Sequence, residues 1–127
     1  MIRFLEKNKE ISFILTFLIT IEIFYVSSIS GTSFGKIGSN LISILYHFIV
    51  FFLFTFFLFI TIKGNKKIKS KYLLIVLIIA IIQAFLDEFH QIFVPFRDAS
   101  IRDILIDAIG IFSAIIIYSH INKKIKR

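Results

Sequence analysis

Apolar residues fill four long segments of the chain, at about residues 11–29, 41–62, 72–93 and 101–121. A helix of about 20 residues, rising about 1.5 Å per residue, crosses a hydrocarbon layer about 30 Å thick. Because lipid offers no partners to backbone amides, a helix is the form that satisfies such a segment. The pattern predicts an all-α protein, an integral membrane four-helix bundle formed by residues 1–127 as one domain. The second segment holds seven phenylalanines between Phe48 and Phe59, which suits contact with lipid.

Composition supports the membrane assignment and limits the chemistry. The chain is 57% apolar and contains no cysteine. Disulfides, thiolate metal sites and cysteine nucleophiles are therefore excluded. Any chemistry has to come from carboxylates, histidines, arginines and hydroxyl groups.

Basic residues predict the orientation of the bundle. Positively charged residues favour the cytoplasmic side of a membrane, so both termini are expected to be cytoplasmic, with residues 27–40 and 94–100 outside. The same distribution explains the net charge of +7 as a topology signal, and we expect no nucleic-acid partner. Twelve of the 15 basic residues lie on the predicted inner side: Arg3, Lys7, Lys9, Lys63, Lys66, Lys67, Lys69, Lys71, Lys123, Lys124, Lys126 and Arg127.

The first apolar segment has a second interpretation, as a cleavable signal peptide with a basic start and small residues near Ser28. We favour a retained helix, because the apolar run is longer than a usual signal core and carries Glu22. The glycines at 31, 35 and 38 indicate a flexible polar loop after it.

A dense polar stretch interrupts the end of the third segment. It reads Asp87-Glu88-Phe89-His90-Gln91, and Pro95 follows, where we expect the helix to end. At 100° per residue, Asp87, His90 and Gln91 share one helix face, while Glu88 lies on its flank with an undecided direction. Ionisable groups are costly inside a membrane, which makes this stretch the first candidate for function.

The fourth segment begins with a predicted helix cap and continues with an acid inside the apolar run. Ser100 is suited to N-cap the helix with Asp103 three residues later, so Asp103 has a structural interpretation besides a functional one. Asp107 lies beyond the cap, inside the apolar segment. Gly110 and Ala114 continue the same stripe and would allow a neighbouring helix to approach closely.

Depth in the membrane places several of these groups at one level. His47 and Asp107 each lie about six residues below the outer ends of their helices, Asp87 lies in the outer third of its helix, and Glu22 is somewhat deeper. In one bundle these side chains can meet in a pocket open to the outer surface.

Other roles stay open for the remaining candidates. Arg97 and Arg102 lie near the predicted pocket mouth, where they either hold a ligand or anchor the helices at the interface. His47 either joins helices by a hydrogen bond or belongs to a site, and Glu22 either pairs with a buried cation or functions. His120, next to the basic tail, is interpreted as an interfacial residue.

With these residues the chain resembles the VanZ-like family of small bacterial membrane proteins. The resemblance covers nearly the whole chain and rests on Ser27, Ser28, His47-Phe48, Asp87-Glu88-x-His90-Gln91, Pro95, Arg97, Ser100, Asp103 and Gly110. It implies a bacterial cell-membrane location and an association with reduced susceptibility to the glycopeptide teicoplanin.

The chain departs from the family pattern in three places. Phe96 stands where a glycine is usual, Asp107 where an asparagine is common, and Ile44 where a lysine often precedes the histidine. Some family members carry a phosphotransbutyrylase label, but the chain has no cofactor-binding or acyl-transfer motif.

These observations lead to one main hypothesis. A polytopic membrane protein engages a cell-envelope component through an outward-facing pocket and lowers glycopeptide susceptibility. Its partners are the lipid bilayer and either a lipid-linked cell-wall precursor or the glycopeptide. The ligand-binding candidates are Glu22, His47, Asp87, Glu88, His90, Gln91, Arg97, Arg102, Asp103 and Asp107.

Two alternatives remain, and the sequence does not decide whether the site is catalytic. In the first, a membrane enzyme uses Asp87, Glu88 and His90 on a lipid-linked phosphate or sugar. These groups, with His47 and Asp107, also suit a divalent metal ion, although no cofactor motif is present. In the second, a small proton-coupled transporter uses intramembrane acids as carriers. The sequence does not indicate an oligomeric state.

Overall fold

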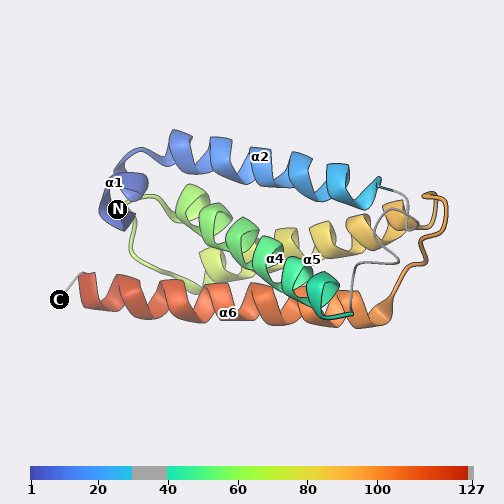
Figure 1. Ribbon diagram of the computed structural model, residues 1–127. Helices are drawn as coiled ribbons and strands as arrows, with labels where there is room; N and C mark the ends of the chain where they lie inside the picture. Colours follow the sequence, from blue (N-terminus) through green and yellow to red (C-terminus); the bar gives the residue numbers. More distant parts are fainter. Residues whose placement is uncertain (30–39, 126–127) are drawn as a thin grey trace.

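A computed structural model describes residues 1–29 and 40–125 of the protein. These residues form helices α1 (Ile2–Lys7), α2 (Lys9–Ser27), α4 (Asn40–Lys63), α5 (Ser70–Gln91) and α6 (Ile101–Ile125), with no strand among them (Figure 1). Four of them, α2, α4, α5 and α6, are long and apolar enough to cross a membrane. The all-α prediction is confirmed, and the protein is a multi-pass membrane protein. The predicted loop with glycines at 31, 35 and 38 lies outside the described residues, as do residues 126 and 127.

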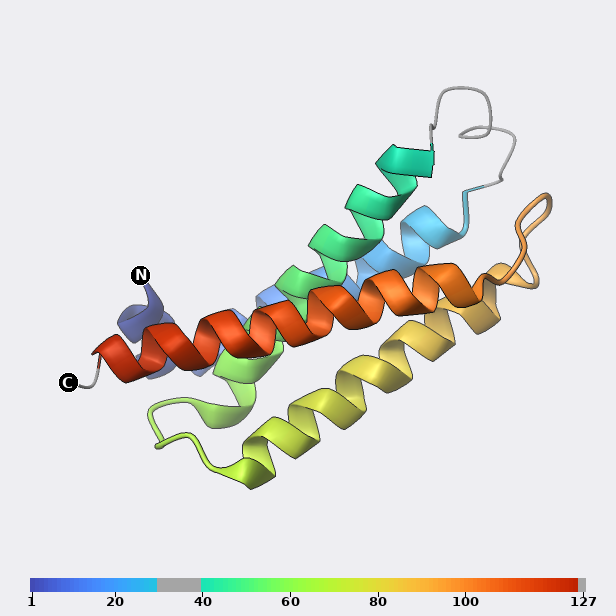
Figure 2. The ribbon, with the colours of Figure 1, turned by 90° about the horizontal axis from the view of Figure 1, so that it is seen from below.

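Helix α4 lies at the centre of the bundle. It contacts α1, α2, α5 and α6, whereas α2 and α6 lie on opposite sides of it (Figures 1 and 2). Helix α1 and the C-terminal part of α6 lie at the same end, together with the α4–α5 connection. We call this the basic end, and we call the opposite end, where α5 stops and α6 starts, the acidic end. The structure leaves the inside-outside orientation as a prediction.

The phenylalanines of α4 face protein as well as lipid, which corrects the lipid-facing interpretation of this helix. Phe51 and Phe59 are fully buried, and Phe54 nearly so. The ring of Tyr118 on α6 packs on Phe59 with 4.6 Å between ring centroids. The difference has a physical reason: lipid tails are as apolar as a protein core in a membrane, so composition does not separate the two surroundings.

Gly110 sets the distance between α4 and α6. A methyl group at Gly110 would lie 2.6 Å from the backbone oxygen of Phe48 and 3.2 Å from the backbone nitrogen of Phe52. Ala114, one turn further along α6, is fully buried. The predicted close approach along this stripe is confirmed, and it brings the backbones of the two helices together just below the acidic end.

Helix α5 ends before the proline that was expected to stop it. Its last residue is Gln91, and the amides of Phe93 and Val94 turn back to the carbonyls of His90 and Gln91 at 3.0 and 3.1 Å. The following turn places Phe96 at φ +60°, a left-handed conformation that favours glycine. Phe96 therefore adopts a backbone conformation typical of glycine, the residue that the resemblance to the VanZ-like family leads one to expect at this position.

Candidate functional site

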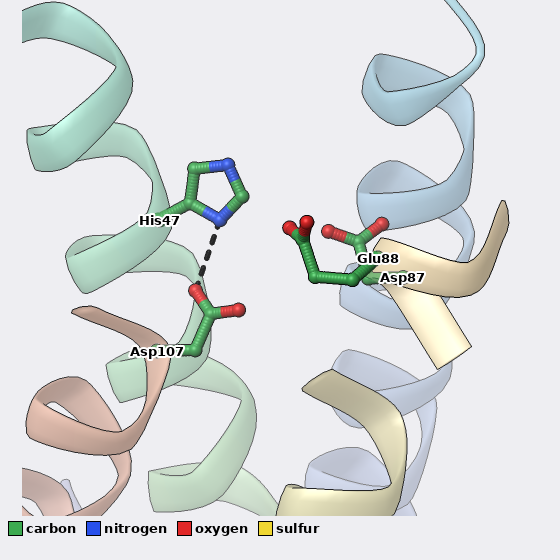
Figure 3. A group of neighbouring side chains, drawn as sticks. All are labelled: His47, Asp87, Glu88 and Asp107. Atoms are coloured by element: carbon green, nitrogen blue, oxygen red, sulfur yellow. Dashed lines mark hydrogen bonds and ion pairs between the residues drawn. The ribbon is translucent and has the colours of Figure 1, made fainter. Parts of the chain in front are cut away.

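Four ionisable side chains from three helices converge near the acidic end. His47 comes from α4, Asp87 and Glu88 from α5, and Asp107 from α6 (Figure 3). One nitrogen or oxygen atom from each lies within 4.8 Å of those from the others, and none of the four residues is more than 2% exposed. We call these four residues the acidic cluster. Because they are far apart in the sequence, the cluster exists only in the packed bundle.

His47 and Asp107 form one side of the cluster. The Nδ1 atom of His47 lies 3.0 Å from Oδ1 of Asp107, and Nε2 lies 4.0 Å from Oδ2 of Asp103. The other oxygen of Asp107, Oδ2, is buried without a hydrogen-bond partner among the described residues and points toward Asp87 and Glu88 (Figure 3). The pair lies just outside the Gly110 crossing, so the close approach of α4 and α6 positions it.

Asp87 and Glu88 form the other side, and neighbouring groups orient both. The hydroxyl of Ser27 on α2 donates a hydrogen bond to Oδ1 of Asp87. The side-chain amide of Gln91 donates to Oδ2 of Asp87 at 3.2 Å and to Oε1 of Glu88 at 3.3 Å. The backbone amide of Ser100 donates to Oε2 of Glu88 at 2.6 Å. Every carboxylate oxygen on this side thus accepts a bond that fixes its direction.

The cap of α6 also explains the direction of Glu88, which sequence spacing left undecided. The amide of Asp103 donates to Oγ of Ser100 at 3.4 Å, which confirms the predicted N-cap. In a capping box the side chain of Asp103 would accept a hydrogen bond from the backbone amide of Ser100. Here the carboxylate of Glu88 accepts that bond instead. The carboxylate of Asp103 lies beside His47 instead, at the edge of the cluster.

Arg97 holds the end of α2 rather than extending away from the protein. Its Nε donates to the carbonyl of Ile29 at 3.1 Å, Nη2 to the carbonyl of Val26 at 3.3 Å, and Nη1 to the side chain of Gln91 at 3.4 Å. Two bonds therefore satisfy carbonyls at the C-terminal end of α2, where a cation is also favourable. Arg102, the second predicted arginine, is exposed near the start of α6.

His90 and Glu22 lie apart from the four clustered residues. Nε2 of His90 lies 2.9 Å from the hydroxyl of Ser28, and that hydroxyl donates to the carbonyl of Phe24 at 2.7 Å. His90 is thus turned toward α2, although it shares a helix face with Asp87. Glu22 is half-buried on α2 and is not among the residues whose ligand atoms converge within 4.8 Å.

The sequence pattern did not predict a second polar network, which lies at the basic end. Oε1 of Glu6 accepts bonds from Nζ of Lys63 at 2.7 Å, the hydroxyl of Tyr118 at 2.6 Å and the side-chain amide of Asn122 at 2.7 Å. All four side chains are buried. They join α1 to α4 and α6, and we call them the basic-end network. The only local signal was the i, i+4 spacing of Tyr118 and Asn122, because Glu6 is 57 residues from Lys63 and 112 from Tyr118.

The acidic cluster has the donor atoms for two kinds of chemistry. Three carboxylates and one imidazole offer oxygen and nitrogen ligands, the set that suits divalent ions such as magnesium, manganese or zinc. The same imidazole, held by a carboxylate, is also the arrangement of a general base.

Comparison with known proteins identifies the family. The profile of the VanZ/LLP1 family matches residues 3–122, nearly the whole chain. No curated protein matches the chain, and no solved structure matches it. The match covers all four helices that are long and apolar enough to cross a membrane up to residue 122, and the chain belongs to the VanZ/LLP1 family.

Proposed function

We propose that the acidic end of this protein binds the polar head of a cell-envelope component, and that this binding lowers susceptibility to glycopeptides such as teicoplanin. The observation that carries the proposal is the burial of three carboxylates and an imidazole within 4.8 Å of one another. Burying such groups in an apolar bundle is costly. The bundle already has the Gly110 crossing and an aromatic core to hold it together, so a binding role accounts for the cluster better than folding does.

The depth of the cluster favours a head group as the ligand. Asp87 lies four residues before the end of α5, Asp107 six residues after the start of α6, and His47 seven after the start of α4. At about 1.5 Å per residue, these positions are about 6 to 11 Å below the helix ends. Helices of 22 to 25 residues are only a few Å longer than a hydrocarbon layer about 30 Å thick, so this level lies a few Å inside the layer. It is next to the boundary at which a lipid-linked precursor carries its phosphate and first sugar.

The charges around the cluster favour a ligand with both hydroxyl groups and negative charge. Carboxylates accept hydrogen bonds from sugar hydroxyls, and Arg102 offers an exposed guanidinium that can bind phosphate with two parallel bonds. A lipid-linked cell-wall precursor combines these groups, and the predicted orientation places the acidic end on the outer side, where glycopeptides act.

The test is a susceptibility assay in a glycopeptide-sensitive host that expresses the protein. Asp87→Asn and Glu88→Gln keep the side-chain shape and remove a charge, so we expect normal membrane levels with loss of protection against teicoplanin. Lys124→Ala, at the opposite end, is the control and should keep full protection. Full protection by both acidic-cluster variants at normal protein level would refute the proposal.

The His47–Asp107 pair favours a second candidate, a membrane enzyme acting on a lipid-linked phosphate. A carboxylate 3.0 Å from Nδ1 would hold the imidazole ready to accept a proton from an attacking water. Incubation of the purified protein with polyprenyl phosphates and diphosphates, followed by phosphate release, tests this. Release that is lost in His47→Gln would favour the enzyme, and intact lipid after prolonged incubation would favour binding alone.

A further inference from the structure

We propose that His47, Asp87, Glu88 and Asp107 form a binding site for one divalent cation. This inference deepens the proposed function, because a cation held by the acidic cluster would bridge it to a phosphate that the carboxylates alone would repel. The argument rests on the geometry of the four side chains, on one unpartnered oxygen and on the balance of charge.

The spacing of the four side chains fits a single ion. Carboxylate oxygens and imidazole nitrogens bind small divalent ions at about 2.0 to 2.4 Å, so two ligands on opposite sides of one ion are about 4.0 to 4.8 Å apart. The candidate ligand atoms here all lie within 4.8 Å of one another. One ion can therefore contact all four residues without a rearrangement of the helices.

Asp107 provides an independent observation that points to a ligand. The residue is fully buried, and its Oδ2 atom has no hydrogen-bond partner among the described residues. The atom points toward Asp87 and Glu88 across the gap (Figure 3). A buried acceptor left without a partner is unfavourable, and a cation between the two sides of the cluster would satisfy it.

The local charge balance also favours a cation. Three buried carboxylates this close together repel one another more strongly than they would in water. Among the described residues, no lysine or arginine lies within ion-pair distance of these three carboxylates, and Arg97 is bonded to α2 and Gln91. A divalent ion would neutralise most of this negative charge at one point.

The bonds around the cluster already have the form of a supporting shell. Ser27, Gln91 and the amide of Ser100 each donate to Asp87 or Glu88, which fixes the directions of the carboxylates and leaves further lone pairs on each oxygen. Such outer partners orient the ligands in known metal sites. The resulting set of three carboxylates and one imidazole suits manganese, zinc or magnesium, and it lacks the thiolates that soft metals and iron–sulfur clusters need.

The test measures cation binding to the purified, detergent-solubilised protein after treatment with a chelator. Titration with Mn²⁺, followed through the electron paramagnetic resonance signal of free Mn²⁺, should give one saturable site per chain. A competing titration with Zn²⁺ and Mg²⁺ then ranks the ions. We expect the Asp107→Asn and Glu88→Gln variants to lose at least about tenfold in affinity.

Asp98→Asn is the matched control, because Asp98 is an exposed acid at the same end of the bundle. It should bind Mn²⁺ as the wild type does. Circular dichroism and thermal unfolding identify any variant that fails to fold, and two independent acidic-cluster variants keep the test decisive. No saturable site in the wild type would overturn the inference, and so would unchanged affinity in a folded Asp107→Asn variant.

This experiment uses no envelope ligand, so it can fail separately from the susceptibility assay. Mn²⁺ binding by the wild type together with full protection by Asp87→Asn and Glu88→Gln would support the cation site and refute the proposed function. Loss of protection in these variants, together with no Mn²⁺ binding by the wild type, would support the proposed function and refute the cation site.

Discussion

The Gly110→Ala substitution tests whether the crossing of α4 and α6 positions the acidic cluster. The added methyl carbon would lie 2.6 Å from the backbone oxygen of Phe48, whereas ordinary van der Waals contact begins at 3.4 Å. The obstructing atom belongs to a helix backbone, so it cannot rotate away as a side chain would. The two helices therefore have to separate by about 0.8 Å at the crossing.

This separation acts directly on the His47–Asp107 pair. His47 precedes Phe48 in the chain, and Asp107 lies one turn before Gly110, so both are carried by the backbone segments that move. The Nδ1 to Oδ1 distance is 3.0 Å, and a shift of that size takes it beyond hydrogen-bond range. Overpacking and the loss of a charge-assisted bond together predict a destabilisation of about 2 to 4 kcal/mol.

The measurement has two parts, made on the same purified protein. Reversible unfolding in lipid bicelles reports the stability of the bundle, and Mn²⁺ titration reports the geometry of the cluster. In Gly110→Ala we expect the free energy of unfolding and the Mn²⁺ affinity both to fall. Ile109→Ala, at a neighbouring position that is 58% exposed on the lipid-facing side, should change neither. Wild-type stability in Gly110→Ala would refute the packing argument, and lower stability with unchanged Mn²⁺ affinity would refute the link between the crossing and the cluster.

Three further predictions concern other parts of the chain. Phe96→Gly should stabilise the protein by about 1 kcal/mol, because it relieves a left-handed backbone at a side chain that is 80% exposed; an unchanged melting temperature would contradict this. Glu6→Ala should cost about 3 to 5 kcal/mol in bicelle unfolding, since it removes the carboxylate beside the buried ammonium of Lys63, and the Glu6→Gln/Lys63→Met double variant should recover part of that loss. A cysteine placed at Asn65 should resist membrane-impermeant reagents in intact cells while one at Gly35, outside the described residues, reacts; the reverse result would place the acidic end inside.

The number and type of the membrane-spanning helices followed directly from the sequence, because a membrane leaves an apolar segment of this length few other forms, whereas the short helix α1 was not predicted. The close packing of α6 along Gly110 and Ala114 was also predictable, because small residues at helical spacing allow a neighbouring helix to approach closely. The burial of Phe51 and Phe59 was not, because lipid and protein core favour the same side chains.

The composition of the acidic cluster was only partly predictable. Depth counting placed His47, Asp87 and Asp107 at one level, as the structure does. Helical spacing favoured His90 over Glu88, whereas in the structure a backbone amide at the start of α6 orients Glu88 inward and Ser28 holds His90 aside. These outcomes depend on contacts between helices, which periodicity within one helix does not contain.

The basic-end network has a consequence for how the protein is made. Glu6 leaves the ribosome 112 residues before its partner Tyr118 and 116 residues before its partner Asn122, both in α6. At about 5 to 20 residues per second, these two partners follow Glu6 by about 6 to 23 seconds. Lys63, which also binds the Glu6 carboxylate, follows it by 57 residues and is available earlier. A nascent chain that stops before α6 therefore lacks the two hydrogen bonds that Tyr118 and Asn122 donate to Glu6, so this end of the bundle reaches its final packing only when α6 has been made.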